Sequence, residues 1–327
     1  IDLKKPGGQA ALKRLAARAD VLTENYRKGA LGLLGLGFDA LHALNPALIY
    51  ASISGYGRTG PAADKGGFDL IAQGVSGLMS ITGEPGGAPV KVGSPVTDLN
   101  AGLLAALGIV SAYVHRLKTG QGQLVDTSLM EAGIHQTAWQ AAIFFATGAS
   151  PGPGGSAHVL AAPYQAFPTA DGWINIGGAN QANWERIARL VGAPELITDP
   201  RFADNSARMA NRDALVALLS AHLRERRTAE WLRDLDAAGI PAGPIQSIGA
   251  MVEDPQTRAR QMVVEIDHPV AGRTRALGVP IKLGATPGSI RRPAPTYGQH
   301  TREVLAEAGY AAAEIDALVA EGAVHAG

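Results

Sequence analysis

Helical and strand patterns alternate through the first third of the chain, and this alternation constrains the fold more than any other feature. Residues 7–19 repeat apolar side chains at helical spacing, and residues 20–26 then have a strand pattern. A helical pattern over 30–46 precedes "LIYASIS" at 48–54, a β-branched run typical of a buried strand. Strands that alternate with helices predict βαβ units and a parallel sheet, as in Rossmann-like α/β folds.

The same alternation continues to residue 148. We expect helices over 68–79 and 131–148, an extended segment over 89–96 and a strand over 121–129. Asp98 opens the longest helical pattern, which ends where Gly120 is expected as a C-cap. Its large apolar residues lie on one helix face: Leu99, Leu103, Leu107, Val110, Val114 and Leu117.

Two segments rich in proline and glycine, 149–157 and 284–295, interrupt these patterns and are typical of linkers. Between them lie a strand pair with a hairpin signal at Asp171-Gly172, three helical patterns, and a second extended pair that turns at Ala271-Gly272. We therefore predict a large α/β domain and a smaller α+β domain. The large domain comprises 1–148 and 290–327, and the small domain comprises 158–283.

Composition excludes several classes of function. Lys+Arg and Asp+Glu both number 29, so no overall field attracts the chain to nucleic acid or to an anionic membrane. The absence of cysteine excludes disulfides, thiolate metal sites and a cysteine nucleophile, and it is typical of a reducing compartment, so we expect a cytoplasmic protein. The apolar stretch 101–114 is too short to span a bilayer. The eight histidines form no H-x-x-x-H pair, and we expect no metal site.

Gly55, Gly57 and Gly60 have the spacing G-x-G-x-x-G of a dinucleotide-binding loop. That function needs a helix that begins at the glycines and binds a pyrophosphate at its N-terminus. Here Pro61 follows, and the next helical pattern begins only near Phe68. In a chain with 41 glycines this spacing arises by chance, so we reject a nicotinamide or flavin site.

Asp98, in "VGSPVTDLNAG", is the carboxylate best placed for chemistry. It lies where an extended segment meets a helix, at the sheet edge where open α/β folds bind ligands. One interpretation is an N-cap of the helix. The other is a nucleophile that neighbouring helix amides keep ionised, and the two interpretations are compatible.

Several motifs, in order along nearly the whole chain, resemble the family III CoA-transferases. They include "IDLKKPGGQ" at the start, "ADVLTENYRKGAL" at 19–31, "LNPALIYASISGYGRTGP" at 44–61, "VGSPVTDLNAGLLAALGI" at 92–109 and "AGIPAGPI" at 238–245. The resemblance implies that Asp98 attacks the thioester of a donor acyl-CoA and forms an acyl-aspartyl anhydride. The resemblance further implies an aspartyl-CoA thioester, from which an acceptor carboxylic acid takes the CoA and leaves as the new acyl-CoA. No tightly bound cofactor is implied, and succinyl-CoA is the donor expected by analogy.

Two alternatives remain open. Racemases of the same fold carry a histidine in the position that Phe68 takes here, and Phe68 cannot carry a proton, so transfer is favoured over α-epimerisation. The second alternative is a catalytically silent homologue that only binds acyl-CoA. The chain opens at Ile1 in what resembles the middle of a strand, so we expect that a segment before it, with further CoA contacts, lies outside this numbering.

The resemblance also implies roles for other residues. Asp69 matches an acidic active-site position, with a charge at a helix N-terminus as its simpler role. Asn25 and Tyr26 match a pair that contacts CoA, and Lys65 lies one position from a CoA-contacting lysine. Leu33 replaces an arginine of the CoA pocket.

Gly154 and Gly155 lie near a glycine run that closes over the intermediate, and they are interpreted first as linker and second as lid. The family fold implies an interlocked homodimer in which two ring-shaped chains pass through each other.

Overall fold

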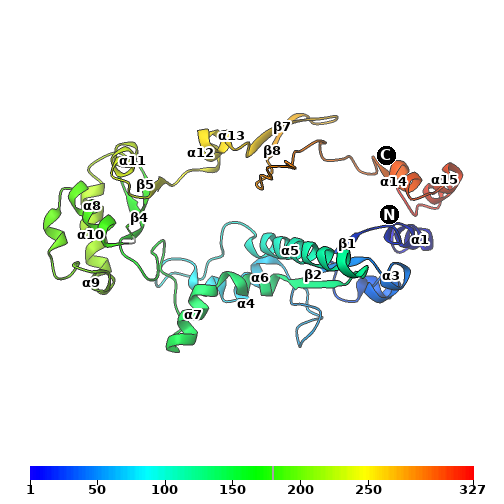
Figure 1. Cartoon of the computed structure of the whole chain (residues 1–327), viewed down its shortest axis with the longest axis horizontal. Helices are drawn as coiled ribbons and strands as arrows, with labels where there is room; N and C mark the ends of the chain where they lie inside the picture. The colour runs from blue at the N-terminus through cyan, green and yellow to red at the C-terminus, as the bar shows by residue number, and fades with distance from the viewer. Residues whose placement is uncertain (179) are drawn as a thin grey trace. The chain divides into compact units, whose positions relative to one another are not determined.

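The computed structural model describes residues 1–178 and 180–327. Its internal contacts divide the chain into two compact units (Figure 1). The first unit comprises Ile1–Pro153 and Pro295–Gly327, and the second comprises Gly154–Ala294. Both boundaries fall within the proline- and glycine-rich segments 149–157 and 284–295.

A three-stranded parallel sheet organises the first unit, as the alternation predicted. Its order is β1 (Val21–Glu24), β2 (Ile49–Ser54) and β3 (Leu124–Ser128). The central strand β2 is buried along nearly its whole length, which agrees with its largely apolar sequence, IYASIS. Leu36, Leu41 and Leu48 form a fully buried cluster beside Tyr50 of this strand.

Left-handed glycines divide two of the predicted helices. The pattern over 30–46 forms α2 (Ala30–Leu33) and α3 (Phe38–Leu44), with Gly35 at a φ of +67° between them. The pattern over 68–79 forms α4 (Asp69–Val75) and the 3₁₀ turn η1 (Leu78–Ile81), with Gly77 at +86°. A positive φ cannot continue a right-handed helix, so each pattern ends at its glycine.

Two further predictions differ from the structure. The extended segment expected over 89–96 pairs with no strand of the described residues: 89–95 is a loop, and Val96 begins the next helix. The pattern over 131–148 forms two helices, α6 (Leu129–Gln136) and α7 (Ala138–Thr147), that meet at Thr137. The Thr137 hydroxyl donates to the carbonyl of Ile134, and this bond closes the last turn of α6.

Helix α5 (Val96–Thr119) is the longest element and ends at Gly120, whose φ of +75° makes it the predicted C-cap. The helix begins two residues before Asp98, so the prediction that Asp98 opens or caps it is wrong. The buried residues of α5 are small, among them Ala101, Ala105 and Ala112. Close approach to the sheet explains this, because a Cβ added at Gly108 would lie 2.6 Å from Cγ1 of Val125.

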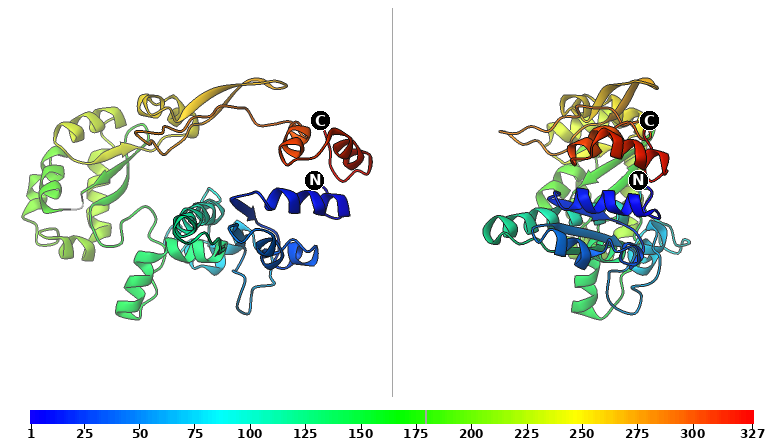
Figure 2. Two further views of the ribbon diagram at one scale, coloured as in Figure 1. Left: turned by 45° about the vertical axis from the view of Figure 1, so that its right-hand side comes forward. Right: turned by 90° about the vertical axis from the view of Figure 1, so that its right-hand side faces the viewer.

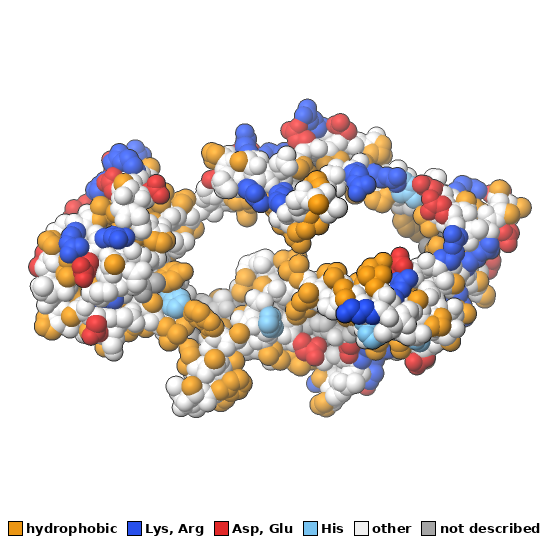
Figure 3. Space-filling model, in the orientation of Figure 1, with side chains coloured by type: hydrophobic (Ala, Val, Ile, Leu, Met, Phe, Trp, Pro, Cys, Tyr) orange, Lys and Arg blue, Asp and Glu red, His pale blue; other side chains and the backbone are white. Residues whose placement is uncertain are grey.

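The large apolar residues of α5 face away from the sheet. Leu99, Leu103 and Leu107 are between 59% and 66% exposed, and side chains of this kind gather along α5 and over α7 in Figure 3. Among the described residues α5 is the one helix long and apolar enough, by length and composition alone, to cross a membrane. The apolar stretch 101–114 is only the middle part of this helix. Buried core helices of other proteins meet the same criterion.

The C-terminal helices complete the first unit. Residues of α14 (Thr301–Glu307) and α15 (Ala312–Ala320) pack against α1 (Pro6–Ala16) in a small core that includes Ala11, Leu305 and Ile315. Arg14 of α1 donates from Nε to the carbonyl of Ala308 at 2.9 Å. The two ends of the chain therefore meet, as the two views of Figure 2 also show.

The second unit contains an antiparallel sheet covered by helices. Its strands are β4 (Tyr164–Pro168), β5 (Trp173–Gly177) and β6 (Ala242–Pro244), and the predicted hairpin at Asp171-Gly172 joins the first two. The helical elements are α8 (Gln181–Leu190), η2 (Pro194–Ile197), α9 (Asn205–Ala210), α10 (Arg212–Leu223), α11 (Thr228–Ala237), α12 (Ile248–Glu253) and α13 (Pro255–Ala259). The predicted second pair forms β7 (Val263–His268) and β8 (Gly272–Leu277).

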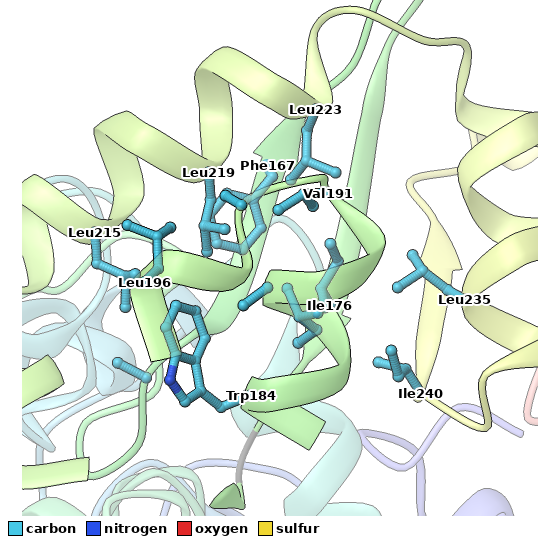
Figure 4. Close-up of a cluster of buried hydrophobic side chains, with 14 of the residues drawn as sticks. Phe167, Ile176, Trp184, Val191, Leu196, Leu215, Leu219, Leu223, Leu235 and Ile240 are labelled. Atoms are coloured by element: carbon cyan, nitrogen blue, oxygen red, sulfur yellow. The ribbon is translucent and has the colours of Figure 1, made fainter. Parts of the chain in front are cut away.

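The core of the second unit surrounds Trp184, which Figure 4 shows among Leu196, Leu215 and Ile176. One buried cation enters this core. The Arg208 guanidinium is fully buried and donates to the carbonyl oxygens of Ala162 and Phe202 at 2.7 and 3.0 Å. Burial lowers the pKa of Arg208, but its hydrogen bonds satisfy carbonyl groups that would otherwise lack a donor.

Candidate active site

A cavity of about 510 Å³ lies at the carboxyl ends of β1 and β2, beside the first turns of α5. This is the sheet edge at which open α/β folds bind ligands. The cavity is lined by Asn25, Tyr26, Arg27, Lys28, Ile53, Ser54, Gly55, Ala63, Lys65, Gly66, Gly67, Phe68, Asp98, Gly102 and Leu129. Five residues singled out from the sequence are therefore brought together here: Asn25, Tyr26, Lys65, Phe68 and Asp98.

Of the three glycines in the G-x-G-x-x-G spacing, Gly55 lines this cavity. Gly57 and Gly60 adopt φ values of +91° and +83°, which other residues rarely reach. Gly55 lies against Gly67, where an added Cβ on Gly67 would lie 2.5 Å from the Gly55 Cα. Two segments of backbone thus cross in contact. The next helix, α4, begins only at Asp69, which agrees with the rejection of a dinucleotide loop.

Asp98 is the third residue of α5, and its exposed side chain lines the cavity. Among residues 1–178 and 180–327, no group donates a hydrogen bond to its carboxylate and no cation pairs with it. Partial burial, and then the negative charge of Asp69, raise the pKa of Asp98 above its ordinary value. An unpaired carboxylate with a raised pKa is more nucleophilic than one held in an ion pair.

Asp69 has a different environment. Its Oδ1 accepts from the backbone nitrogen and hydroxyl of Thr97, at 3.0 and 2.8 Å, and its Oδ2 accepts from Gln73 Nε2 at 2.7 Å. Burial raises the pKa of Asp69, but the bonds from Thr97 and Gln73 outweigh burial and the pKa is lowered. Asp69 is not among the residues that line the cavity. Asp69, the first residue of α4, thus caps the N-terminus of α5, so Asp98 is not needed as the cap.

Gln73 extends this cap to the loop before α5. Its side chain is fully buried, and its Oε1 accepts from the backbone nitrogen of Val92 at 2.8 Å. Its Nε2 also donates to the carbonyl of Ser94 at 3.5 Å, so both ends of the Gln73 amide group tie the loop before Asp98 to α4. This fixes the direction in which α5 begins.

Three cations line the cavity, and two of them were not identified from the sequence. Lys28 pairs with Asp64 at 3.5 Å, whereas Arg27 and Lys65 have no carboxylate partner in the described part of the chain. The Arg27 guanidinium lies over Gly66, 3.4 Å from where a Cβ would stand. Leu33, which takes the place of an expected arginine, is 91% exposed and does not line the cavity.

Gly154 and Gly155 belong to the second unit and are not among the lining residues. Gly155 has a φ of +59°, so it needs glycine for its turn. Their role as a lid stays a prediction.

The arrangement combines a free carboxylate with unpaired cations, which suits attack on the carbonyl of a substrate that carries negative charge elsewhere. Phe68 is 78% exposed at the same cavity and offers a ring surface but no proton.

Comparisons with known proteins identify the family of the chain. The model of CoA-transferase family III matches residues 1–301. The chain is 37% identical over 306 residues to the succinate–glutarate CoA-transferase of Agrobacterium fabrum, covering 94% of this chain and 76% of that protein. It is 38% identical over 308 residues to the succinyl-CoA–D-citramalate CoA-transferase of Chloroflexus aurantiacus, covering 94% and 77%. A solved CaiB/BaiF family protein from Brucella suis superposes with a TM-score of 0.83 at 38% identity, covering 94% of this chain and 80% of the other.

Proposed function

The chain belongs to CoA-transferase family III and moves CoA between an acyl-CoA and a carboxylate, and we propose that Asp98 is the nucleophile of this transfer. The observation that carries the proposal is a carboxylate without hydrogen-bond or ion-pair partners among the described residues, at the cavity between β1, β2 and α5. CoA enters and leaves as a substrate.

The reaction proceeds in four steps. A carboxylate oxygen of Asp98 attacks the thioester carbonyl of the donor, the C–S bond breaks, and CoA leaves as the thiolate. The thiolate attacks the aspartyl carbonyl of the resulting anhydride and releases the donor acid. The acceptor carboxylate then attacks the aspartyl-CoA thioester, the C–S bond breaks, and CoA leaves again as the thiolate while a second anhydride forms. The thiolate finally attacks the acceptor carbonyl and regenerates Asp98. No general base is needed, because the two carboxylates are anions at neutral pH and CoA is released as the thiolate in the step before it attacks.

Succinyl-CoA is the donor that we propose, with a small dicarboxylic acid as acceptor. The names of the relatives from Agrobacterium fabrum and Chloroflexus aurantiacus support this choice. The unpaired cations Arg27 and Lys65 at the cavity support binding of a polyanionic substrate.

Oxygen transfer tests the nucleophile directly. When glutarate labelled with ¹⁸O in both carboxylates accepts CoA from succinyl-CoA, one labelled oxygen remains on Asp98. Peptide mass spectrometry after turnover should show the heavier species on the Asp98 peptide and not on the Asp69 peptide. Asp98→Asn and Asp98→Ala should show neither transfer nor label. Turnover without label on Asp98 contradicts the proposal.

We also propose that the enzyme is a homodimer in which a second copy covers α5. The support is the outward face of α5, where Leu103, Leu107 and Leu117 are each more than 60% exposed. Apolar patches of this kind on soluble proteins mark interaction surfaces. The interlocked form is implied by the family resemblance.

α-Epimerisation is not favoured, because Phe68 lines the cavity where a second base is needed. Incubation of a chiral 2-methylacyl-CoA in D₂O without acceptor should leave the α-proton unexchanged.

A further inference from the structure

One row of polar residues crosses the whole sheet of the first unit at its carboxyl end. Glu24 of β1 is in register with Ser52 of β2, and Ser52 is in register with Asp126 of β3. Glu24 and Ser52 are only 8% and 2% exposed. A buried carboxylate at this position needs a counter-charge and hydrogen-bond donors to remain ionised.

Arg58, from the glycine-rich loop after β2, supplies the counter-charge. Its Nη1 lies 3.5 Å from Oε1 of Glu24 and donates to the Ser52 hydroxyl at 3.2 Å. Ser52 in turn donates to Oε1 of Glu24 at 2.5 Å. The backbone nitrogen of Arg58 donates to Oδ2 of Asp126 at 3.2 Å, so Arg58 is bound to both outer strands.

The second carboxylate oxygen of Glu24 binds the backbone of the segment that lines the cavity. Oε2 accepts from the backbone nitrogen of Tyr26 at 2.8 Å. Tyr26 lines the cavity together with Asn25 and Arg27, which flank it in the chain. Burial, and then the negative charge of Glu24, raise the pKa of Tyr50 to about 12.

We propose that Glu24 and Arg58 are positioning residues for acyl-CoA binding. The ion pair with Arg58 holds Oε1 of Glu24, and Oε2 of Glu24 then fixes the backbone of residues 25–27, which form one wall of the cavity. This inference rests on the proposed function, since the wall is the part of the cavity assigned to CoA. Neither residue lines the cavity, and each acts through the backbone of Tyr26.

Substitution of each partner, singly and together, tests the inference. Glu24→Gln and Arg58→Gln should each raise the KM for succinyl-CoA about tenfold with kcat within about twofold, because ground-state and transition-state binding are lost equally. The double variant should raise the KM by less than the product of the two single effects, because it leaves no buried charge unpaired. Arg58→Lys, which keeps the charge, should restore most of the loss.

Asp20→Asn is the matched control. Asp20 pairs with Arg116 at 2.7 Å, directly before the same strand β1 but at its opposite end. Its loss should leave the KM unchanged.

Hydrogen exchange of the free enzyme gives a readout that is independent of activity. The Tyr26 amide should exchange at least about fivefold faster in Glu24→Gln than in the native protein, and at the native rate in Asp20→Asn. Variants that melt at a lower temperature but keep the native KM and Tyr26 exchange rate would overturn the inference and leave a purely structural ion pair. A native enzyme that neither binds CoA nor transfers it would instead overturn the proposed function, whatever the Tyr26 exchange rate.

Discussion

The Asp69 carboxylate accepts two hydrogen bonds from Thr97, one from the backbone nitrogen at 3.0 Å and one from the hydroxyl at 2.8 Å. Asp98, the next residue, therefore begins its turn of α5 with the helix end already capped. Of these two neighbouring carboxylates, that of Asp69 caps α5, whereas that of Asp98 has no hydrogen-bond or ion-pair partner among the described residues.

Replacement of Asp69 by Asn should destabilise the first unit by about 1 kcal/mol, the usual cost of weakening a helix cap. The folded-state pKa of Asp69 is lowered, so its contribution is present above the unfolded pKa and is lost as the pH falls through the folded value. Urea unfolding at pH 7 and at pH 3 should show the difference from native shrinking at the lower pH. An undiminished difference at pH 3 would contradict this account.

Asp98→Asn should abolish transfer and yet raise the melting temperature at pH 7. The folded-state pKa of Asp98 is raised, so ionisation opposes folding above that value, and a neutral amide avoids this cost. The gain should vanish when the pH falls below the ordinary pKa of aspartate. Calorimetry across this range measures it, and a variant less stable than native at pH 7 would show that the carboxylate is held by contacts instead.

Gly67→Ala should destabilise the first unit by about 1–3 kcal/mol and weaken CoA binding, because its Cβ would lie 2.5 Å from the Gly55 Cα. Backbone on both sides leaves no flexible atom to move. Gly93→Ala is the control, since nothing lies within 4 Å of its added Cβ. Equal effects of the two substitutions on the urea midpoint would refute the proposed close packing.

Leu107→Glu, in the middle of the outward face of α5, should weaken dimerisation about a hundredfold or more, because a charge would be buried without a partner. Leu107 is 64% exposed in the single chain. Sedimentation velocity should show monomers at micromolar concentration. Val270→Glu places the same charge on an exposed apolar residue at the turn between β7 and β8 and should leave the native state of association. Unchanged sedimentation of Leu107→Glu would exclude α5 from the interface.

Most strands and both hairpins followed from the sequence because side-chain patterns determine them, whereas the short strand β6 was not predicted. β2 is a largely apolar run, and Asp171-Gly172 favours one tight turn. Helix breaks at Gly35 and Gly77 could not be placed, because apolar spacing does not report the sign of φ. The family resemblance, not residue spacing, indicated that Asn25, Tyr26 and Asp98 share a site, which the cavity now contains.

Contacts between residues that lie far apart in the chain could not be predicted from the sequence. The pair Glu24 and Arg58, and the cap that Asp69 gives to α5, each depend on which elements the fold brings together. Arg27 gave no signal either, because a lone arginine in a loop is usually a solvated surface residue. The outward direction of the α5 leucines was likewise hidden, since the periodicity of a helix identifies a face but not what covers it.

The crossing of Gly55 and Gly67 has a consequence for how such an enzyme can diverge. Gly55 and Gly67 present main chain to the cavity, and a Cβ added at either would lie 2.8 or 2.5 Å from the Cα of the other. No side chain can replace the hydrogen at these two positions without moving the backbone. A change of preferred acid is therefore expected at the other lining positions, among which Tyr26 and Phe68 have large exposed rings.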